Sequence, residues 1–165
     1  DLAGAEVELV GKMSREHQLK KHLDKIKDNY DLVIIDCPPS LGLLTLNALS
    51  ASDSLIIPIQ CEFYALEGLT QLLNTINLVK ENLNSNLEIA VILLTMYDKR
   101  LNLSEEVSKD IKDYFGNKVF DTIIPRNIKL SEAPSYGEPI DIYNKNSRGS
   151  KAYEKLAKEV IKSDL

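Results

Sequence analysis

The chain has 165 residues, of which 44% are apolar and 27% are charged, a composition typical of a folded globular domain that excludes disordered and collagen-like chains. A chain of this length buries roughly two-thirds of the surface that it exposes when unfolded, so it needs no disulfide or structural metal to form a core. Its 20 Lys and Arg against 25 Asp and Glu give a net charge of -5, so any contact with nucleic-acid phosphate must come from a local basic patch.

Alternating helical and strand patterns follow one another along the chain. Leu19, Leu23 and Ile26 recur at helical spacing behind a possible N-cap, Ser14, and the all-apolar run 32–35 then predicts a strand in the middle of a parallel sheet. Helices are predicted over residues 14–29, 43–51, 64–82, 104–116 and 150–161. Strands are predicted over residues 32–35, 55–59, 89–94 and 119–124, and residues 125–147 are predicted to be loop. This order predicts one α/β domain over residues 1–165, with a parallel sheet flanked by helices.

The last two predicted helices have distinct end and face signals. Ser104 is expected to cap the helix over 104–116, and Gly116 to close it. The helix predicted over 150–161 has an apolar face formed by Tyr153, Leu156, Val160 and Ile161. We expect this face to pack on the sheet, and the alternative is an anchor at a membrane surface.

The sequence gives no sign of secretion or of membrane insertion. Cys37 and Cys61 lie far apart and outside any C-x-x-C pair, which fits a reducing compartment better than a disulfide framework. No apolar run approaches the ~18 residues that span a bilayer, and the N-terminus lacks the pattern of a signal peptide. We therefore expect a cytoplasmic protein.

Polar residues follow three of the predicted strands, and ligands bind at the carboxyl ends of strands in a parallel sheet. Asp36 suits a Mg²⁺ site, although an aspartate that caps a turn fits the local pattern equally well. The segments 95–100 and 125–127 could read a base edge, or they could be surface turns. Six cations near these strand ends could form a basic patch, or they could be scattered solvated charges: Lys99, Arg100, Arg126, Lys129, Lys145 and Arg148.

Four ordered blocks of the sequence resemble the ParA/Soj family of chromosome-partitioning ATPases. The block at residues 30–42, which reads YDLVIIDCPPSLG, resembles the Walker B and switch II segment of that family. The other blocks are 57–68, 93–98 and 124–137, so the resemblance covers nearly the whole chain. It implies the deviant-Walker P-loop NTPase fold of ParA and MinD proteins. It also implies an ATP- and Mg²⁺-dependent homodimer that coats double-stranded DNA without sequence preference and works with a ParB-type partner on the nucleoid.

The resemblance also assigns roles to individual residues. Asp36 would be the catalytic switch II residue, near the γ-phosphate and bound to Mg²⁺ through water. The nucleotide would be held by Thr95, Met96, Pro125, Arg126 and Asn127. Arg100 and Lys129 would match the basic positions that contact DNA, and this favours the basic patch over scattered charges.

The chain departs from the family pattern at its N-terminal side. Gly4 and Gly11 are the only glycines before Gly42, so the glycine-rich Walker A loop that cradles phosphates is missing. The chain also begins without Met. We therefore expect an N-terminally truncated fold, the C-terminal portion of such an ATPase, which does not hydrolyse ATP alone and whose exposed sheet edge favours self-association.

Two other functions fit parts of the sequence. One is a MinD-type, membrane-associated regulator of cell division, which the blocks after the last predicted strand and the weak terminal anchor disfavour. The other is a non-enzymatic α/β interaction module that has lost nucleotide chemistry and folds as a monomer indifferent to ATP.

Overall fold

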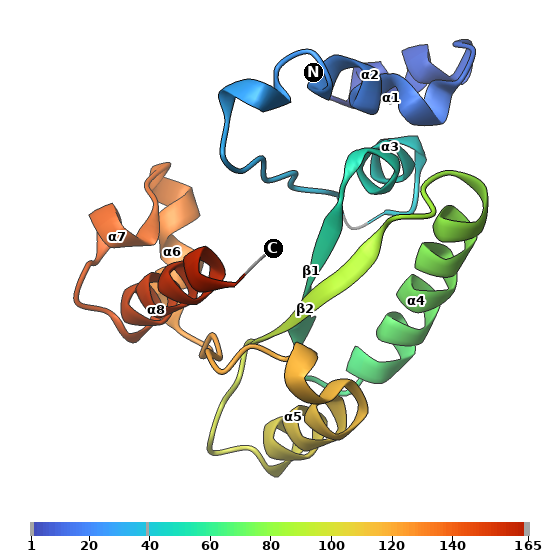
Figure 1. Cartoon of the computed structure of the whole chain (residues 1–165). Coiled ribbons are helices and arrows are strands. Elements are labelled where there is room, and N and C mark those ends of the chain that lie inside the picture. Colours follow the sequence, from blue (N-terminus) through green and yellow to red (C-terminus); the bar gives the residue numbers. More distant parts are fainter. Residues whose placement is uncertain (1, 39, 164–165) are drawn as a thin grey trace. The chain divides into compact units, whose positions relative to one another are not determined.

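The computed structural model describes residues 2–38 and 40–163, and the chain divides into two compact units. The first unit comprises Asp1–Leu55 and Thr70–Glu88, and the second comprises Ile56–Leu69 and Ile89–Leu165. Figure 1 shows the elements coloured in chain order.

Short helices make up much of the first unit. They are α1 (Leu2–Val10), α2 (Gln18–Leu23) and α3 (Leu43–Ala51), with single 3-10 turns at 15–17 and 27–29. The helix over 43–51 is confirmed, but the single helix over 14–29 is wrong, because this stretch is broken into shorter pieces. Ser14 has a φ of 50°, in the left-handed region, and its side chain caps no N–H.

A buried asparagine on α3 holds the broken stretch instead. Asn47 Oδ1 accepts a hydrogen bond from the Leu19 N–H at 3.0 Å, and its Nδ2 donates to the Arg15 carbonyl at 2.8 Å. Buried polar groups need partners of this kind, so a side chain 28 positions away in sequence satisfies the backbone that a continuous helix would have satisfied itself.

The strand predicted over 32–35 is absent. Residues 32–38 belong to no helix or strand, and the side chains of Leu32, Val33 and Ile34 are 52%, 42% and 79% exposed. A strand exists only when a neighbour pairs with its N–H and carbonyl groups. Within residues 2–38 and 40–163, no segment provides that pairing, so the apolar run is left in solvent.

The sheet is parallel and has two named strands, β1 (Ser54–Gln60) and β2 (Glu88–Thr95), joined by α4 (Ala65–Asn82). These elements confirm the predictions over 55–59, 64–82 and 89–94. Four consecutive residues of β2, 91–94, are all buried, as expected for a strand covered on both faces. In β1, Ile57 and Ile59 are buried but Ile56 is 42% exposed, so among the described residues only one of its faces is covered.

The segment predicted as a strand over 119–124 runs beside β2 without forming a regular strand. Phe120 N donates to Ile92 O at 3.0 Å and Ile124 N donates to Leu94 O at 2.9 Å, which places it parallel to β2. Between these bonds, the N–H groups of residues 121 and 122 donate to the carboxylate of Glu159 instead of to a strand. The prediction is therefore right about where this segment lies and that it runs parallel to β2, but wrong that it forms a regular strand.

The rest of the second unit is helical. α5 (Asn102–Phe115) begins two residues before the predicted start, and Gly116 closes it with a φ of 57°. The loop predicted over 125–147 is wrong, because it contains α6 (Ile128–Glu132), a 3-10 turn at 133–136 and α7 (Ile140–Tyr143). Asn127 accounts for the first of these, since its side chain accepts the Lys129 N–H at 2.8 Å and so caps α6.

The final helix, α8 (Arg148–Lys162), covers one buried cluster of the second unit, which contains Val91, Leu93, Phe120 and Ile124. Leu156 and Val160 pack against this cluster, which confirms docking of the helix on the sheet. Tyr153 and Ile161 were expected on the same face but are 44% and 82% exposed. Figure 1 shows α6, α7 and α8 grouped together at this side of the unit.

Candidate functional site

The carboxyl ends of β1 and β2 lie side by side. Cys61 N donates to Thr95 O at 2.9 Å, which extends the parallel pairing one residue past β1. The hydroxyl of Thr95 donates to Ile59 O at 3.2 Å and so points toward the neighbouring strand. Within the second unit, the loops that follow these strands therefore leave the sheet at one edge.

The two segments predicted to hold a nucleotide are joined through their backbones. Tyr97 N donates to Ile124 O at 3.2 Å, and Arg126 N donates to Tyr97 O at 2.9 Å, with Tyr97 and Pro125 forming a parallel bridge. Met96, directly after the last residue of β2, has a φ of 53°. Non-glycine residues in this left-handed region are uncommon and cost free energy, so the backbone here is held by its surroundings.

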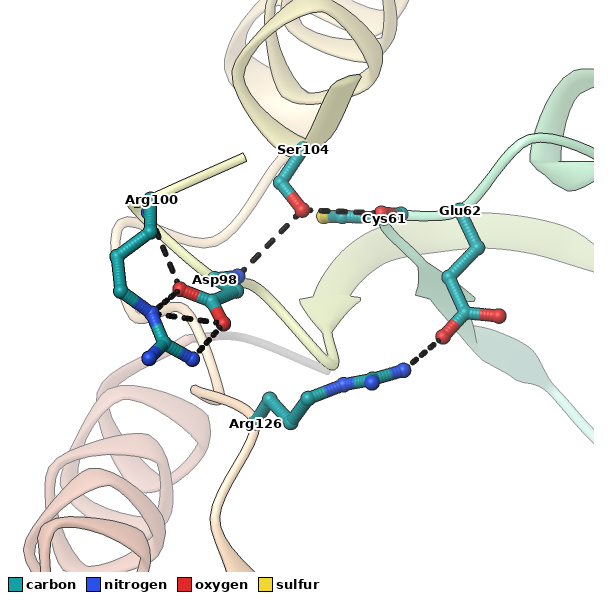
Figure 2. Close-up of polar contacts among 6 residues, drawn as sticks. All are labelled: Cys61, Glu62, Asp98, Arg100, Ser104 and Arg126. Atoms are coloured by element: carbon teal, nitrogen blue, oxygen red, sulfur yellow. Dashed lines mark hydrogen bonds and ion pairs between the residues drawn. The ribbon is translucent and has the colours of Figure 1, made fainter. Parts of the chain in front are cut away.

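An ion pair crosses the same edge from the end of β1. Arg126 Nη2 donates to Glu62 Oε1, although the two residues are 64 positions apart, and Figure 2 shows the two side chains meeting. Both are about half exposed, at 52% and 47%, so we assign the pair a modest stabilising effect of about 0–1 kcal/mol. Its main consequence is that the side chain of Arg126 is directed along the strand ends.

Ser104 is a site residue that the sequence pattern misread. It lies inside α5 and not at its N-cap, is 1% exposed, and donates its hydroxyl to Cys61 O at 3.1 Å while accepting the Asp98 N–H at 3.5 Å. Figure 2 shows Ser104 between these two segments. The buried Ser104 hydroxyl therefore links α5 to the loops that follow β1 and β2. In the sequence, a serine near the start of a predicted helix indicated only an N-cap.

Asp98 and Arg100 form a second carboxylate–guanidinium contact (Figure 2). Arg100 Nε donates to Oδ1 at 2.9 Å and Nη2 donates to Oδ2 at 2.6 Å, while the Arg100 backbone N–H donates to Oδ1 at 3.1 Å. These donors hold the pKa of the Asp98 carboxyl well below its usual range. The Arg100 side chain is 80% exposed, so its outer surface faces solvent even while paired.

Lys129, the other cation predicted for DNA, belongs to a cluster on α6 and α7. Its Nζ lies 2.8 Å from Glu132 Oε2, and the Tyr143 hydroxyl donates to the same oxygen at 2.8 Å. The bond to Glu132 raises the pKa of Tyr143 to about 12. Tyr143 stacks on Tyr136 with ring centroids 5.0 Å apart, and the Lys129 ammonium lies 5.8 Å from the centroid of the Tyr143 ring.

Asp36 belongs to the first unit, whereas the other predicted site residues all belong to the second. It is exposed and follows the run at 32–35, which belongs to no helix or strand. Within residues 2–38 and 40–163, no group of three or more His, Cys, Asp or Glu side chains could hold a metal ion. Over the same residues, no helix is long and apolar enough to cross a membrane.

Comparison with known proteins gives a consistent set of relatives. Residues 1–89 match a family model described as an AAA domain. The sporulation initiation inhibitor protein Soj of Bacillus subtilis is 61% identical over 159 residues, which is 96% of this chain and 63% of that protein. The chromosome-partitioning ATPase Soj of Treponema pallidum is 56% identical over 164 residues, covering 99% of this chain and 65% of that protein. The chain thus spans less than two-thirds of the length of either relative.

Solved structures show the same architecture. Cobyrinic acid a,c-diamide synthase from Mycobacterium smegmatis, with a bound ATP analogue and magnesium, superposes with a TM-score of 0.77 at 38% identity, covering 98% of this chain and 59% of that one. The cell division ATPase MinD of Pyrococcus furiosus gives a TM-score of 0.69 at 25% identity, over 89% of this chain and 58% of that one.

Proposed function

The chain belongs to the ParA/Soj family of chromosome-partitioning ATPases and has the fold of ParA/MinD-type P-loop NTPases, and we propose that it is part of an ATPase that moves chromosome or plasmid origins. The observation that carries the proposal is the 61% identity to Soj over 96% of the chain. In the proposal, the complete ATPase, called the whole protein below, binds ATP as a homodimer. It coats double-stranded DNA on the nucleoid, in the cytoplasm, and is stimulated by a ParB-type partner.

We place the nucleotide at the carboxyl edge of β1 and β2. The adenine would lie among Thr95, Met96, Pro125, Arg126 and Asn127. The backbone bonds that join residues 97, 124 and 126 support this placement, because they fix two loops from different strand ends against each other. Loops fixed at the carboxyl ends of parallel strands are the usual place for a ligand in this class of sheet.

The residues of this chain fit Mg²⁺-ATP only in part. Mg²⁺ keeps most of its water and takes one or two carboxylates together with substrate phosphates, and Asp36 supplies one such carboxylate. No glycine-rich loop that could cradle phosphates occurs before Gly42. In the proposal, the phosphate cradle lies in the part of the whole protein that this chain does not include, and the chain alone is inactive.

The unpaired run at 32–35 also supports the proposal that part of the fold lies outside this chain. An apolar stretch left 42–79% exposed at residues 32, 33 and 34 is the expected appearance of a strand whose neighbours are elsewhere. In the whole protein, those neighbours would pair with it. Asp36 would then stand at the end of a paired strand.

Calorimetric titration with Mg²⁺-ATP tests the nucleotide proposal. We expect no detectable binding to the 165-residue chain, and binding to the whole protein that Asp36→Ala weakens. Binding of Mg²⁺-ATP to the chain alone with full dependence on Asp36 would contradict the proposed division of the site. Failure of the whole protein to bind or hydrolyse ATP would contradict the ATPase function itself.

We propose that Arg100 and Lys129 contact DNA phosphates. Arg100 is 80% exposed and Lys129 is 44% exposed, so both can reach a partner from the surface of the second unit. Substituting both by Ala in the whole protein should weaken binding to duplex DNA of any sequence and reduce the dependence on salt, by about 0.9 per lost phosphate contact on a log–log plot. An unchanged affinity and salt slope would remove these residues from the DNA surface.

The packing of α8 favours the partitioning function over a MinD-type membrane function. Leu156 and Val160 are turned to the core and so are not available to a lipid surface. A pull-down with liposomes should leave the protein in the supernatant, whereas co-sedimentation would favour the membrane function.

A further inference from the structure

The cations proposed for DNA are each held by a carboxylate of the same chain. Arg100 is paired with Asp98, and Lys129 is paired with Glu132. An ammonium or guanidinium that already contacts a carboxylate must give up that contact, or share it, before it can bind a phosphate. The affinity of the surface for DNA therefore depends on these carboxylates as well as on the cations.

We propose that Glu132 is a built-in competitor of DNA phosphate for Lys129, and that Tyr143 holds it in place. The proposal rests on the DNA contact proposed above for Lys129. Its consequence is a DNA affinity held below the value that the cations alone would give.

The contact between Lys129 and Glu132 is more constrained than an ordinary ion pair on a protein surface. Glu132 Oε2 receives two donors at 2.8 Å, one from Lys129 and one from the hydroxyl of Tyr143. Tyr143 is in turn fixed by its stacking on Tyr136. The carboxylate is thus oriented from two sides, and the paired Lys129 and Glu132 side chains are only 44% and 36% exposed.

An ion pair on α8 provides a matched control. Lys158 Nζ lies 2.6 Å from Glu154 Oε1, and the two side chains are 67% and 64% exposed. Glu154→Gln changes the net charge of the protein by the same amount as Glu132→Gln, but it frees a lysine that is not proposed to contact DNA. A general effect of charge would therefore appear equally in both variants.

The experiment measures binding of the whole protein, with Mg²⁺-ATP, to duplex DNA of arbitrary sequence across a salt series. We expect Glu132→Gln to bind about two- to fivefold more tightly at low salt, the range that the strength of exposed ion pairs implies. Its log–log salt slope should steepen by up to about 0.9, since Lys129 would then neutralise a phosphate fully. Glu154→Gln should match the unsubstituted protein in slope.

Two further variants test the route of the effect. Tyr143→Phe keeps the aromatic ring but removes the hydroxyl that holds Glu132, so it should tighten DNA binding in the same direction by a smaller factor. In a Lys129→Ala background, Glu132→Gln should have no effect beyond that of Glu154→Gln.

The outcomes separate this inference from the proposed function. If the unsubstituted protein binds DNA but Glu132→Gln is no tighter than Glu154→Gln, the competitor role is refuted and the DNA function stands. A gain that persists without Lys129 would also refute it. If the unsubstituted protein does not bind duplex DNA at all, both proposals fall together.

Discussion

Two helical glycines should respond in opposite directions to the same substitution. Gly149 is buried near the start of α8, and a Cβ added there would lie 2.5 Å from Leu130 Cγ, 2.8 Å from Cδ1 and 2.9 Å from Cδ2. Carbon atoms pack at about 3.5–4.0 Å, so the overlap is close to 1 Å. Gly68 lies in α4 with no atom within 4 Å of such a Cβ. Position 68 therefore has room for the methyl group of alanine, whereas at position 149 the methyl group would clash with Leu130.

The direction of the stability change depends on whether the gain in helix propensity or the cost of overpacking is larger. Replacing Gly by Ala inside a helix gains up to about 1 kcal/mol from backbone propensity, and Gly68→Ala should raise the free energy of unfolding by that amount. Overpacking typically costs about 1–3 kcal/mol, and Leu130 has little room to yield because it packs against the core of the second unit. Gly149→Ala should therefore lower the free energy of unfolding by about 1–2 kcal/mol.

Urea denaturation followed by circular dichroism measures both variants on the same scale. Adding Leu130→Ala to Gly149→Ala should show a favourable coupling, because the shortened side chain makes room for the methyl group. If Gly149→Ala is as stable as Gly68→Ala, then Leu130 of α6 and Gly149 of α8 are not packed as closely as the structure shows.

Two other substitutions address the site, and a third addresses the contact of α8 with residues 121 and 122. Asn127→Ala should lower the free energy of unfolding by about 0.5–2 kcal/mol through loss of the α6 cap, with Asn127→Ser retaining most of it, as denaturation midpoints will show. Ser104→Ala should cost about 1–3 kcal/mol, because the buried hydroxyl that bridges Cys61 and Asp98 disappears, and a stability equal to the unsubstituted chain would contradict that bridge. Although burial opposes the change, hydrogen bonds from residues 121 and 122 lower the pKa of Glu159 from its usual value of 4.5. Its contribution to stability is therefore present above pH 4.5 and lost as the pH falls through the lowered pKa, so Glu159→Gln should flatten acid unfolding monitored by fluorescence.

Local patterns were enough to predict most of the longer regular elements. The apolar runs of β1 and β2 and the periodicity of α4, α5 and α8 are strong signals because each element buries its own stripe or face. The short helices between 128 and 143 were missed, since five- and four-residue helices have almost no periodicity. Asn127 before a mixed segment was the one available signal of a cap.

The family and the identities of the candidate site residues follow from the sequence by itself, because motif residues keep their order along the chain whatever surrounds them. Tertiary structure alone decided which strands exist and which side chains meet. The run at 32–35 has the composition of a central strand, yet residues 32, 33 and 34 are exposed here, since strand pairing requires a partner that composition does not provide. The contacts of Arg126 with Glu62 and of Lys129 with Glu132 and Tyr143 depend on how separate segments pack. Residue spacing along the chain does not predict that packing.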